Sequence, residues 1–269
     1  MNPTFCHITQ RLSPFYGEQE AREMAFWIME EIYHLNRTEI LLRKDVPVSD
    51  EIERILLRLE QREPLQYIFG HTCWRGLDLH VSPATLIPRP ETAELVDWIE
   101  TDCQDERLRV LDIGTGSGCI AIALQKDRPQ WEVTALDISP QALEIAQQNA
   151  KRNGVELHWL CKDILGSDPM DTYDVMVSNP PYIRNSEKEN MSRNVLDYEP
   201  ETALFVSDND PLLFYRRIAE RRIAKRLYFE VNEQLAHQTA YCLQQNGYTH
   251  TIIKQDIYGK ERMVFGCLH

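Results

Sequence analysis

The segment YDVMVSNPPYI, residues 173–183, places polar side chains directly after an apolar run. The run reads as a short buried strand, and the tetrapeptide that follows cannot continue a sheet ladder. Pro180 and Pro181 each fix their own φ angle, and Pro180 restricts Asn179 to an extended conformation, so the Asn179 carboxamide is held at the strand end. Asn179 and a neighbouring proline carbonyl can together accept both hydrogens of a planar –NH₂ group, and Tyr182 can stack on the plane to which that nitrogen belongs.

An amide or adenine nitrogen is a poor nucleophile because its lone pair is delocalised. Acceptors on both N–H bonds raise its electron density and orient it toward an electrophilic methyl group, an effect of several kcal/mol. The tetrapeptide therefore predicts a site that presents an –NH₂ group to a methyl donor. The alternative is a proline turn or a proline-motif ligand, but a P-P-x-Y ligand needs a residue that PPYI lacks.

A glycine-rich turn lies at the end of an earlier predicted strand. Its residues are Gly114, Thr115, Gly116, Ser117 and Gly118. Glycines let the backbone approach a ligand closely, and the helix that follows offers free N–H groups. The spacing is not that of a dinucleotide fingerprint and no lysine follows to neutralise phosphate, although a bare structural turn remains an alternative.

Two acids end the next two predicted strands. Asp137 can accept both hydroxyls of a ribose through charge-assisted hydrogen bonds, and its alternative role is a helix cap before Ser139. Asp163 can accept an adenine amino proton while Ile164 packs on the ring, and its alternative is a surface loop acid. Together with the glycine turn, these acids predict a groove for an adenosine without pyrophosphate.

The overall charge and the cysteines restrict the possible partners. Of 269 residues, 29 are Lys or Arg and 42 are Asp or Glu, a net charge of −13 that disfavours extended nucleic acid as a partner. Seven cysteines without a C-x-x-C pair predict reduced thiols rather than disulfides or a metal site. No stretch approaches the roughly 18 apolar residues of a membrane span, and a cytoplasmic protein without a membrane partner is expected.

The pattern of the chain changes near residue 70. Apolar positions recur at helical spacing over residues 17–42 and 50–62, whereas residues 70–90 alternate like strands around several prolines. From residue 108 onward, strands and helices alternate, with Ser139 as an N-cap and Pro140 at the first helical position. Such alternation predicts an α/β fold with a mostly parallel, doubly wound sheet whose ligands lie at the carboxyl ends of the strands.

Several motifs in combination resemble a known family. LDIGTGSG, ALDIS and VSNPPYI look like class I S-adenosylmethionine-dependent methyltransferases that act on planar amino groups. PLQYIFG, LIPRPETAELV and YEPETALF resemble the HemK/PrmC family, which methylates N5 of the glutamine in the Gly-Gly-Gln motif of peptide chain release factors. The resemblance implies a Rossmann-like seven-stranded sheet with a small N-terminal helical domain.

The resemblance also implies domains and residue roles. Residues 1–72 would be a helical substrate-docking domain, 73–87 a hairpin-like linker and 88–269 the catalytic domain. S-adenosyl-L-methionine would be the cofactor and S-adenosyl-L-homocysteine the product. The cofactor would be held by Gly114, Thr115, Gly116, Ser117, Gly118, Asp137, Asp163, Ile164 and Asn179. Asn179, Pro180 and Tyr182 would be catalytic, and the substrate would contact Asn179, Pro180, Pro181, Tyr182, Arg89 and Glu91. Ile164 stands where relatives often carry an aromatic residue.

Other functions fit parts of the pattern. A DNA adenine or ribosomal RNA guanine methyltransferase is disfavoured by the net charge, although the DNA enzymes share the tetrapeptide. An oxidoreductase would need the dinucleotide glycine spacing. A cofactor-binding scaffold without catalysis is disfavoured because Asn179 and Tyr182 are both present. Release factors, with no sequence-specific nucleic acid, are the expected partners.

Overall fold

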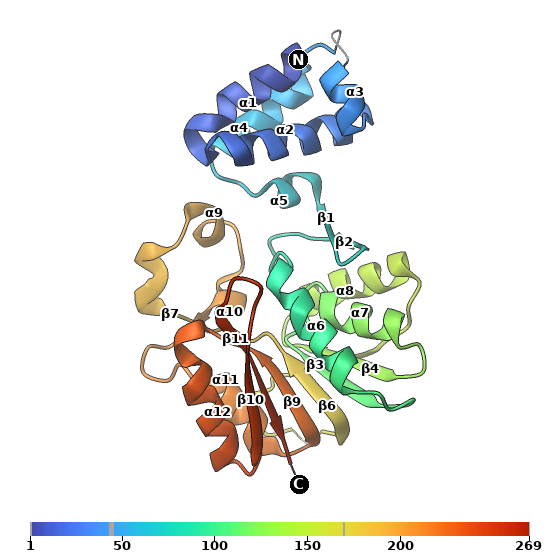
Figure 1. Cartoon of the computed structure of the whole chain (residues 1–269), viewed down its shortest axis with the longest axis vertical. Coiled ribbons are helices and arrows are strands. Elements are labelled where there is room, and N and C mark those ends of the chain that lie inside the picture. The colour runs from blue at the N-terminus through green and yellow to red at the C-terminus, as the bar shows by residue number, and fades with distance from the viewer. Residues whose placement is uncertain (1, 43–45, 169, 269) are drawn as a thin grey trace. The chain divides into compact units, whose positions relative to one another are not determined.

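The computed structural model describes residues 2–42, 46–168 and 170–268. Two compact units divide the chain: residues 1–69 with 193–198, and residues 70–192 with 199–269 (Figure 1). The first break therefore lies three residues before the expected end of the helical domain, and residues 193–198 return to the smaller unit. The expected hairpin-like linker over 73–87 falls within the larger unit.

The smaller unit is helical around one apolar core. Its helices are α1 (Pro3–Tyr16), α2 (Glu18–Tyr33), α3 (Arg37–Leu42), α4 (Asp50–Glu60), α5 (Leu65–Phe69) and the short α9 (Arg193–Leu196). Ile8, Ile28 and Leu56, from three different helices, are fully buried in this core. Tyr198 joins the returning segment to the unit, since its hydroxyl donates to the Gln61 carbonyl at 3.1 Å. The unit can thus bury a core of its own.

Helix boundaries in this unit depart from the hydrophobic pattern. The periodicity over residues 17–42 continues across a break, because His34 adopts a left-handed conformation with φ of 53° and ends α2. The structure also adds α1, which the apolar pattern had not indicated. Asn2 caps α1 by accepting from the backbone N–H groups of Thr4 and Phe5, and Pro3 occupies its first position.

The larger unit is built on a seven-stranded sheet, which confirms the expected fold class. Its strands are β3 (Arg109–Ile113), β4 (Glu132–Asp137), β5 (His158–Cys161), β6 (Tyr173–Ser178), β9 (Ala224–Glu230), β10 (His250–Gln255) and β11 (Glu261–Cys267). The strand order is β10-β11-β9-β6-β3-β4-β5. β3 pairs in parallel with both β4 and β6, and β11 runs antiparallel to β9 and β10. The carboxyl ends of the parallel strands therefore share one edge.

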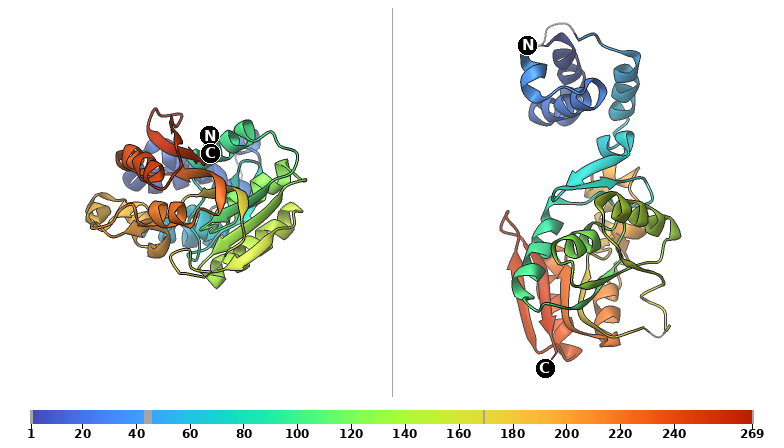
Figure 2. Two further views of the ribbon diagram at one scale, coloured as in Figure 1. Left: turned by 90° about the horizontal axis from the view of Figure 1, so that it is seen from below. Right: turned by 90° about the vertical axis from the view of Figure 1, so that its right-hand side faces the viewer.

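Helices cover both faces of this sheet (Figure 2). One face is covered by α6 (Pro90–Asp102), α7 (Cys119–Asp127) and α8 (Pro140–Asn153), and the other by α11 (Leu213–Arg221) and α12 (Ala236–Gln245). Val175 and Val177 pack into the first apolar cluster, whereas Met176 between them packs into the second. A strand buried on both faces reads as a continuous apolar run, as VMV does in the sequence.

Short elements complete the larger unit. They are the hairpin of β1 (His71–Trp74) and β2 (Leu77–His80), the parallel pair β7 (Ile183–Arg184) and β8 (Phe205–Val206), helix α10 (Glu201–Leu204), and 3₁₀ turns at Asn185–Asn190 and Glu233–Leu235. Within the described part of the chain, no helix is both long and apolar enough to cross a membrane.

A buried asparagine explains why the β1–β2 hairpin belongs to the larger unit. Asn149 on α8 accepts from the His80 N–H at 2.6 Å and donates to the His80 carbonyl at 2.9 Å. Its amide also donates to the Ser117 carbonyl at 2.8 Å. One fully buried side chain thus ties the hairpin to the glycine-rich turn.

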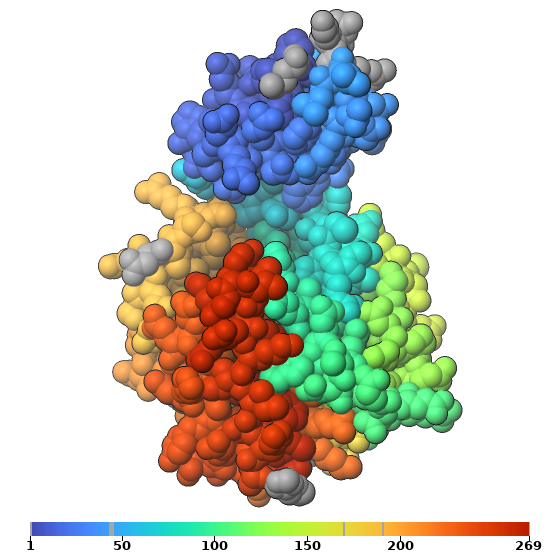
Figure 3. All heavy atoms as spheres, in the orientation of Figure 1, coloured from blue at the N-terminus to red at the C-terminus, as the bar shows by residue number. Residues whose placement is uncertain are grey.

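The tip of the β10–β11 hairpin lies against α6, as the space-filling view shows (Figure 3). The Ile257 N–H there donates to the Glu94 carboxylate at 3.1 Å. The side chains of Ile257 and Tyr258 are exposed. The hairpin therefore joins the edge of the sheet to α6.

The absence of a side chain at Gly118 allows α7 and α8 to pack closely. Its φ is +83°, and an added Cβ would lie 3.0 Å from both Ala146 Cβ and Ile122 Cδ1. We expect Gly118→Ala to destabilise the protein more than the roughly 1–2 kcal/mol cost of a left-handed alanine. Gly154→Ala is the matched control, since Gly154 has a φ of +72° but open space around it. Equal losses of unfolding free energy in urea titrations would mean that helix approach does not matter here.

Candidate active site

A pocket of about 410 Å³ opens at the carboxyl edge of the parallel strands. It brings together most of the residues singled out from the sequence. Those lining it are Gly114, Thr115, Gly116, Ser117, Asp137, Asp163, Ile164, Asn179, Pro180, Pro181 and Arg89. These residues come from the ends of four strands and from the loop before α6. They meet in one cavity because the carboxyl ends of parallel strands share one edge of the sheet.

The glycine-rich turn is fixed by the neighbouring strand. The N–H groups of Gly114 and Thr115 both donate to the Leu136 carbonyl, at 2.8 and 2.9 Å. Gly114, Gly116 and Gly118 all have positive φ, which side chains rarely tolerate. Gly118 itself does not line the pocket and instead lets α7 and α8 approach each other. A Cβ on Gly114 would meet no atom within 4 Å, so space is open beside the turn.

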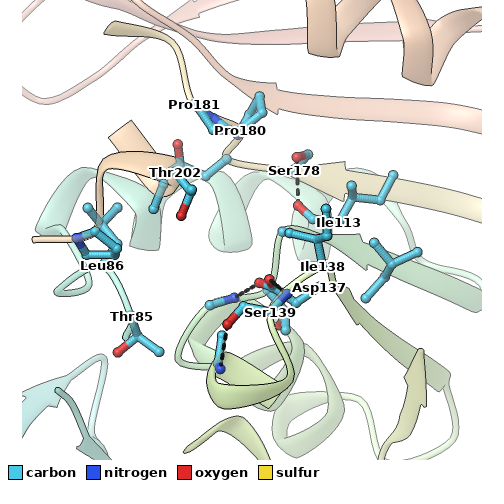
Figure 4. Close-up of a pocket in the computed structure, with 18 of the residues that line it drawn as sticks. Thr85, Leu86, Ile113, Asp137, Ile138, Ser139, Ser178, Pro180, Pro181 and Thr202 are labelled. Atoms are coloured by element: carbon cyan, nitrogen blue, oxygen red, sulfur yellow. Dashed lines mark hydrogen bonds between the residues drawn. The ribbon is translucent and has the colours of Figure 1, made fainter. Parts of the chain in front are cut away.

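Asp137 binds the backbone of two loops beside the pocket. Its Oδ2 accepts from the Gly116 N–H and its Oδ1 from the Ser139 N–H, both at 2.9 Å. Both bonds are drawn in Figure 4. A carboxylate has about four acceptor sites, so two remain for ligand hydroxyls. Asp137 therefore shapes the loop before α8 and still faces the pocket.

The loop after β5 is held by an arginine on α11. Ile164 is buried, and the exposed Asp163 accepts from the Leu165 N–H at 2.8 Å. Arg221 on α11 donates to the carbonyls of Ile164, Gly166 and Asp168 at 2.5–3.1 Å. One guanidinium thus fixes the loop that carries Asp163 and Ile164.

The tetrapeptide closes the opposite side of the pocket. Figure 4 shows Pro180 and Pro181 across the cavity from Asp137 and Ser139. The Ser178 hydroxyl donates to the Ile113 carbonyl at 2.7 Å, which fixes the end of β6 against β3. Asn179 follows directly and lines the pocket, as the strand-stop argument predicted.

Two expected substrate residues do not line this pocket. Tyr182 packs partly into the apolar cluster beneath α11, and its hydroxyl donates to Glu230 at 3.2 Å. Burial and the nearby Glu230 raise the pKa of Tyr182, so its phenol stays a neutral donor. Glu91 lies in the first turn of α6, outside the lining. Contact of either side chain with a substrate remains a prediction.

Arg89 lines the pocket, but its charge is paired. Its guanidinium donates to Glu199 at 2.6 Å, and the Glu199 side chain is 2% exposed. Glu199 also accepts from the Ile87 N–H at 3.3 Å. The YEPETALF segment is therefore joined to the IPRPE loop by a partly buried ion pair, a contact that the sequence had not predicted.

Two further polar residues beside the tetrapeptide escaped the sequence reading. Glu230 ends β9, next to β6, and is buried with 3% exposure. Its Oε2 accepts from the hydroxyl of buried Thr92 at 2.7 Å. The signal for Glu230 was present, since it is an acid at a strand end like Asp137 and Asp163. Thr92 lies 138 residues away in the sequence, so nothing local linked the two.

The chemistry of the pocket fits an adenosine-containing sulfonium cofactor. Asp137 ends β4, Asp163 lies two residues beyond β5, and the glycine turn offers backbone groups beside open space. Buried Asp112, below the turn, keeps one carboxylate oxygen without a hydrogen-bond partner. No cluster of three or more metal-ligating side chains occurs among residues 2–42, 46–168 and 170–268.

Comparison with known proteins decides the family. The PrmC N-terminal domain family matches residues 7–70, and the Methyltransferase small domain family matches residues 91–200. The release factor glutamine methyltransferase of Flavobacterium psychrophilum is 43% identical over 269 aligned positions, covering 95% of this chain and 94% of the relative. The protein of the same name from Bacteroides thetaiotaomicron is 42% identical, covering 98% and 99%. The chain belongs to the release factor glutamine methyltransferase family. Membership confirms the enzyme class and the cofactor expected from the sequence, S-adenosylmethionine.

Solved structures support the fold of the chain. The hMettl16 catalytic domain in complex with MAT2A 3'UTR hairpin 1 has a TM-score of 0.60 at 16% identity, covering 99% of this chain and 92% of that one. A methyltransferase from Pyrococcus furiosus has a TM-score of 0.52 at 17% identity, covering 82% and 98%. At such identities the likeness is one of fold.

Asp112 gives this family member a pH-dependent stability that can be measured. Burial raises the pKa of Asp112 to about 7, while the Thr115 hydroxyl bond opposes the shift and the nearby Asp137 adds to it. An unfolded aspartate ionises near about 3.9. Folding is therefore penalised progressively as the pH rises from about 4 to about 7, and the full penalty persists above that range.

We expect Asp112→Asn to remove this penalty. Relative to the parent, the variant should gain unfolding free energy with increasing pH, by up to about 4 kcal/mol between about pH 4 and pH 8. Urea titrations at several pH values, without cofactor, measure the difference. A difference that does not change with pH would show that Asp112 does not titrate in this range.

Proposed function

We propose that the chain transfers a methyl group from S-adenosylmethionine to the side-chain amide nitrogen of the glutamine in the Gly-Gly-Gln motif of peptide chain release factors. The observation that carries this proposal is the placement of Asn179 and Pro180 in one pocket with the glycine turn, Asp137 and Asp163. Relatives named for release factor glutamine methylation, matching nearly the whole chain, support the substrate.

The cofactor side of the pocket has its binding groups on three strand ends. When bound, S-adenosylmethionine supplies an electrophilic methyl group. Asp137 has free acceptor sites for the ribose hydroxyls, Asp163 for the adenine amino group, and Ile164 an apolar surface for the ring. The turn from Gly114 to Gly118 has room for the methionine end.

The acceptor side depends on Asn179 and Pro180. Asn179 Oδ1 and the Pro180 carbonyl oxygen each accept one hydrogen of the glutamine –NH₂, which keeps electron density on nitrogen and fixes its direction. Pro181 maintains the loop conformation. Tyr182 and Glu91 lie outside the pocket lining and would contact the substrate beyond its –NH₂ group. Arg89 holds the wall through Glu199 and contacts the substrate at the mouth.

The helical unit would dock the release factor. Its own core allows it to present a surface independently of the catalytic sheet. The net charge of −13 suits a basic protein partner better than nucleic acid, which carries the same sign. A protein acting on release factors works where translation takes place, so the proposed location is the cytoplasm.

The decisive experiment offers three acceptors in parallel to the protein and labelled S-adenosylmethionine. They are a purified release factor, the same factor with its Gly-Gly-Gln glutamine replaced by alanine, and duplex DNA. We expect label on the first alone. Label on DNA would assign the site to a base amino group, and label on none, with the cofactor bound in calorimetry, would support a scaffold without catalysis.

Asn179→Ala tests the acceptor grip. Loss of one of two acceptors on the –NH₂ group should reduce methyl transfer by at least about 100-fold, while the dissociation constant of S-adenosylmethionine changes less than about tenfold. Asn246→Ala is the control, since Asn246 caps α12 outside the pocket lining. Undiminished turnover by Asn179→Ala would contradict the role given to the amide.

A further inference from the structure

A chain of hydrogen bonds runs from the interior of the sheet to Asn179. The Glu230 carboxylate accepts from Thr92 Oγ1 at 2.7 Å and from the Tyr182 hydroxyl at 3.2 Å. Thr92 Oγ1 lies 3.3 Å from Asn179 Nδ2. Glu230 and Thr92 are 3% and 2% exposed, so water does not compete freely for these bonds.

The direction of this chain follows from the donor and acceptor capacity of each group. An ionised carboxylate only accepts, so Thr92 must use its single hydroxyl hydrogen on Glu230. The Thr92 oxygen then offers lone pairs alone to Asn179. The carboxamide must therefore turn its NH₂ toward Thr92, and Oδ1 points the other way.

We propose that Thr92 and Glu230 are positioning residues that fix the flip of the Asn179 carboxamide, so that Oδ1 is the atom presented to the hydrogen of the acceptor –NH₂. This inference rests on the proposed function, in which Asn179 grips the acceptor amide. If the Asn179 carboxamide were rotated by half a turn, its Nδ2 hydrogens would face the hydrogens of the acceptor –NH₂ group. Thr92 lines the pocket and Glu230 does not, and neither needs to touch the substrate for this effect.

Protonation of Glu230 removes the directing force. A protonated carboxyl group can donate to Thr92, whose hydrogen is then free to donate to Asn179 Oδ1 after the amide turns. Burial raises the pKa of Glu230, and Glu91 on α6 adds to the shift. Hydrogen bonds from Thr92 and Tyr182 and the charge of Arg262 on β11 oppose it. Methyl transfer should therefore fall on the acid side, at a pH above the ordinary range of a glutamate.

A purely structural role makes a different prediction. The Thr92–Glu230 bond also joins the first turn of α6 to β9, so its loss costs stability in either case. A bond that only holds α6 would change the unfolding free energy without separating turnover from cofactor affinity. It would also leave the pH profile of turnover unchanged.

The test compares Thr92→Val, Thr92→Ser and Thr239→Val. Valine keeps the shape of threonine but removes the hydroxyl, and serine keeps the hydroxyl. Thr239 on α12 is the matched control, because it is buried and its hydroxyl has no hydrogen-bond partner. We expect Thr92→Val to lower kcat at least about tenfold with the S-adenosylmethionine Kd within about threefold, and the other two variants to stay within about threefold in both.

The pH profile of kcat for Glu230→Gln is an independent test, and it can be measured even if Thr92→Val does not fold. Because glutamine does not titrate, the acid limb of the kcat profile should disappear whatever the absolute rate. Equal losses in Thr92→Val and Thr92→Ser, full activity of Thr92→Val, or an unchanged acid limb in Glu230→Gln would each overturn the proposal. Full activity of Asn179→Ala would instead overturn the acceptor role of Asn179 on which it rests, whereas absence of label on the release factor with the parent protein would overturn the proposed function.

Discussion

The parallel pairing of β3 with both β4 and β6 determines where this molecule can bind and react. In-register parallel strands end at one edge of the sheet. Strand pairing alone therefore brings together the loops that follow these three strands. The Ser178 hydroxyl on the Ile113 carbonyl extends that register to the last residue of β6. Asn179, the next residue, is thereby placed in the same pocket as the glycine turn.

The polar contacts around the pocket extend this backbone framework. Asp137 ties the glycine turn to the start of α8, and Asn149 ties the same turn to the β1–β2 hairpin. Arg221 fixes the third loop, and Glu199 fixes the wall that carries Arg89. Each of these side chains satisfies backbone or charged groups in loops that would otherwise be left to water, which keeps irregular backbone rigid. A rigid site preserves the orientation that a weak nucleophile requires.

The strand-end residues could be read from the sequence because each lies within two residues of the end of its strand. Ser139 with Pro140, and Asn179 with the prolines, are local signals that act within a few residues. The Thr92–Glu230 bond could not be read, because it joins positions brought together only by the folded sheet. The break of α2 at His34 was missed for another reason: hydrophobic periodicity continues through a left-handed residue, so the pattern does not record where the backbone stops.

The charge distribution of the pocket distinguishes its ligand from those of other glycine-rich loops. A phosphate-binding turn places a cation or a lysine beside the glycines, whereas here Cys119 follows them and Arg89 is neutralised by Glu199. Two carboxylates, Asp137 and Asp163, line the cavity, and Lys162 lines it as well. Each carboxylate attracts a sulfonium cation and repels a pyrophosphate. The attraction between these carboxylates and the ligand weakens once the sulfur loses its positive charge, so the same residues that favour the methyl donor also favour release of its neutral-sulfur product.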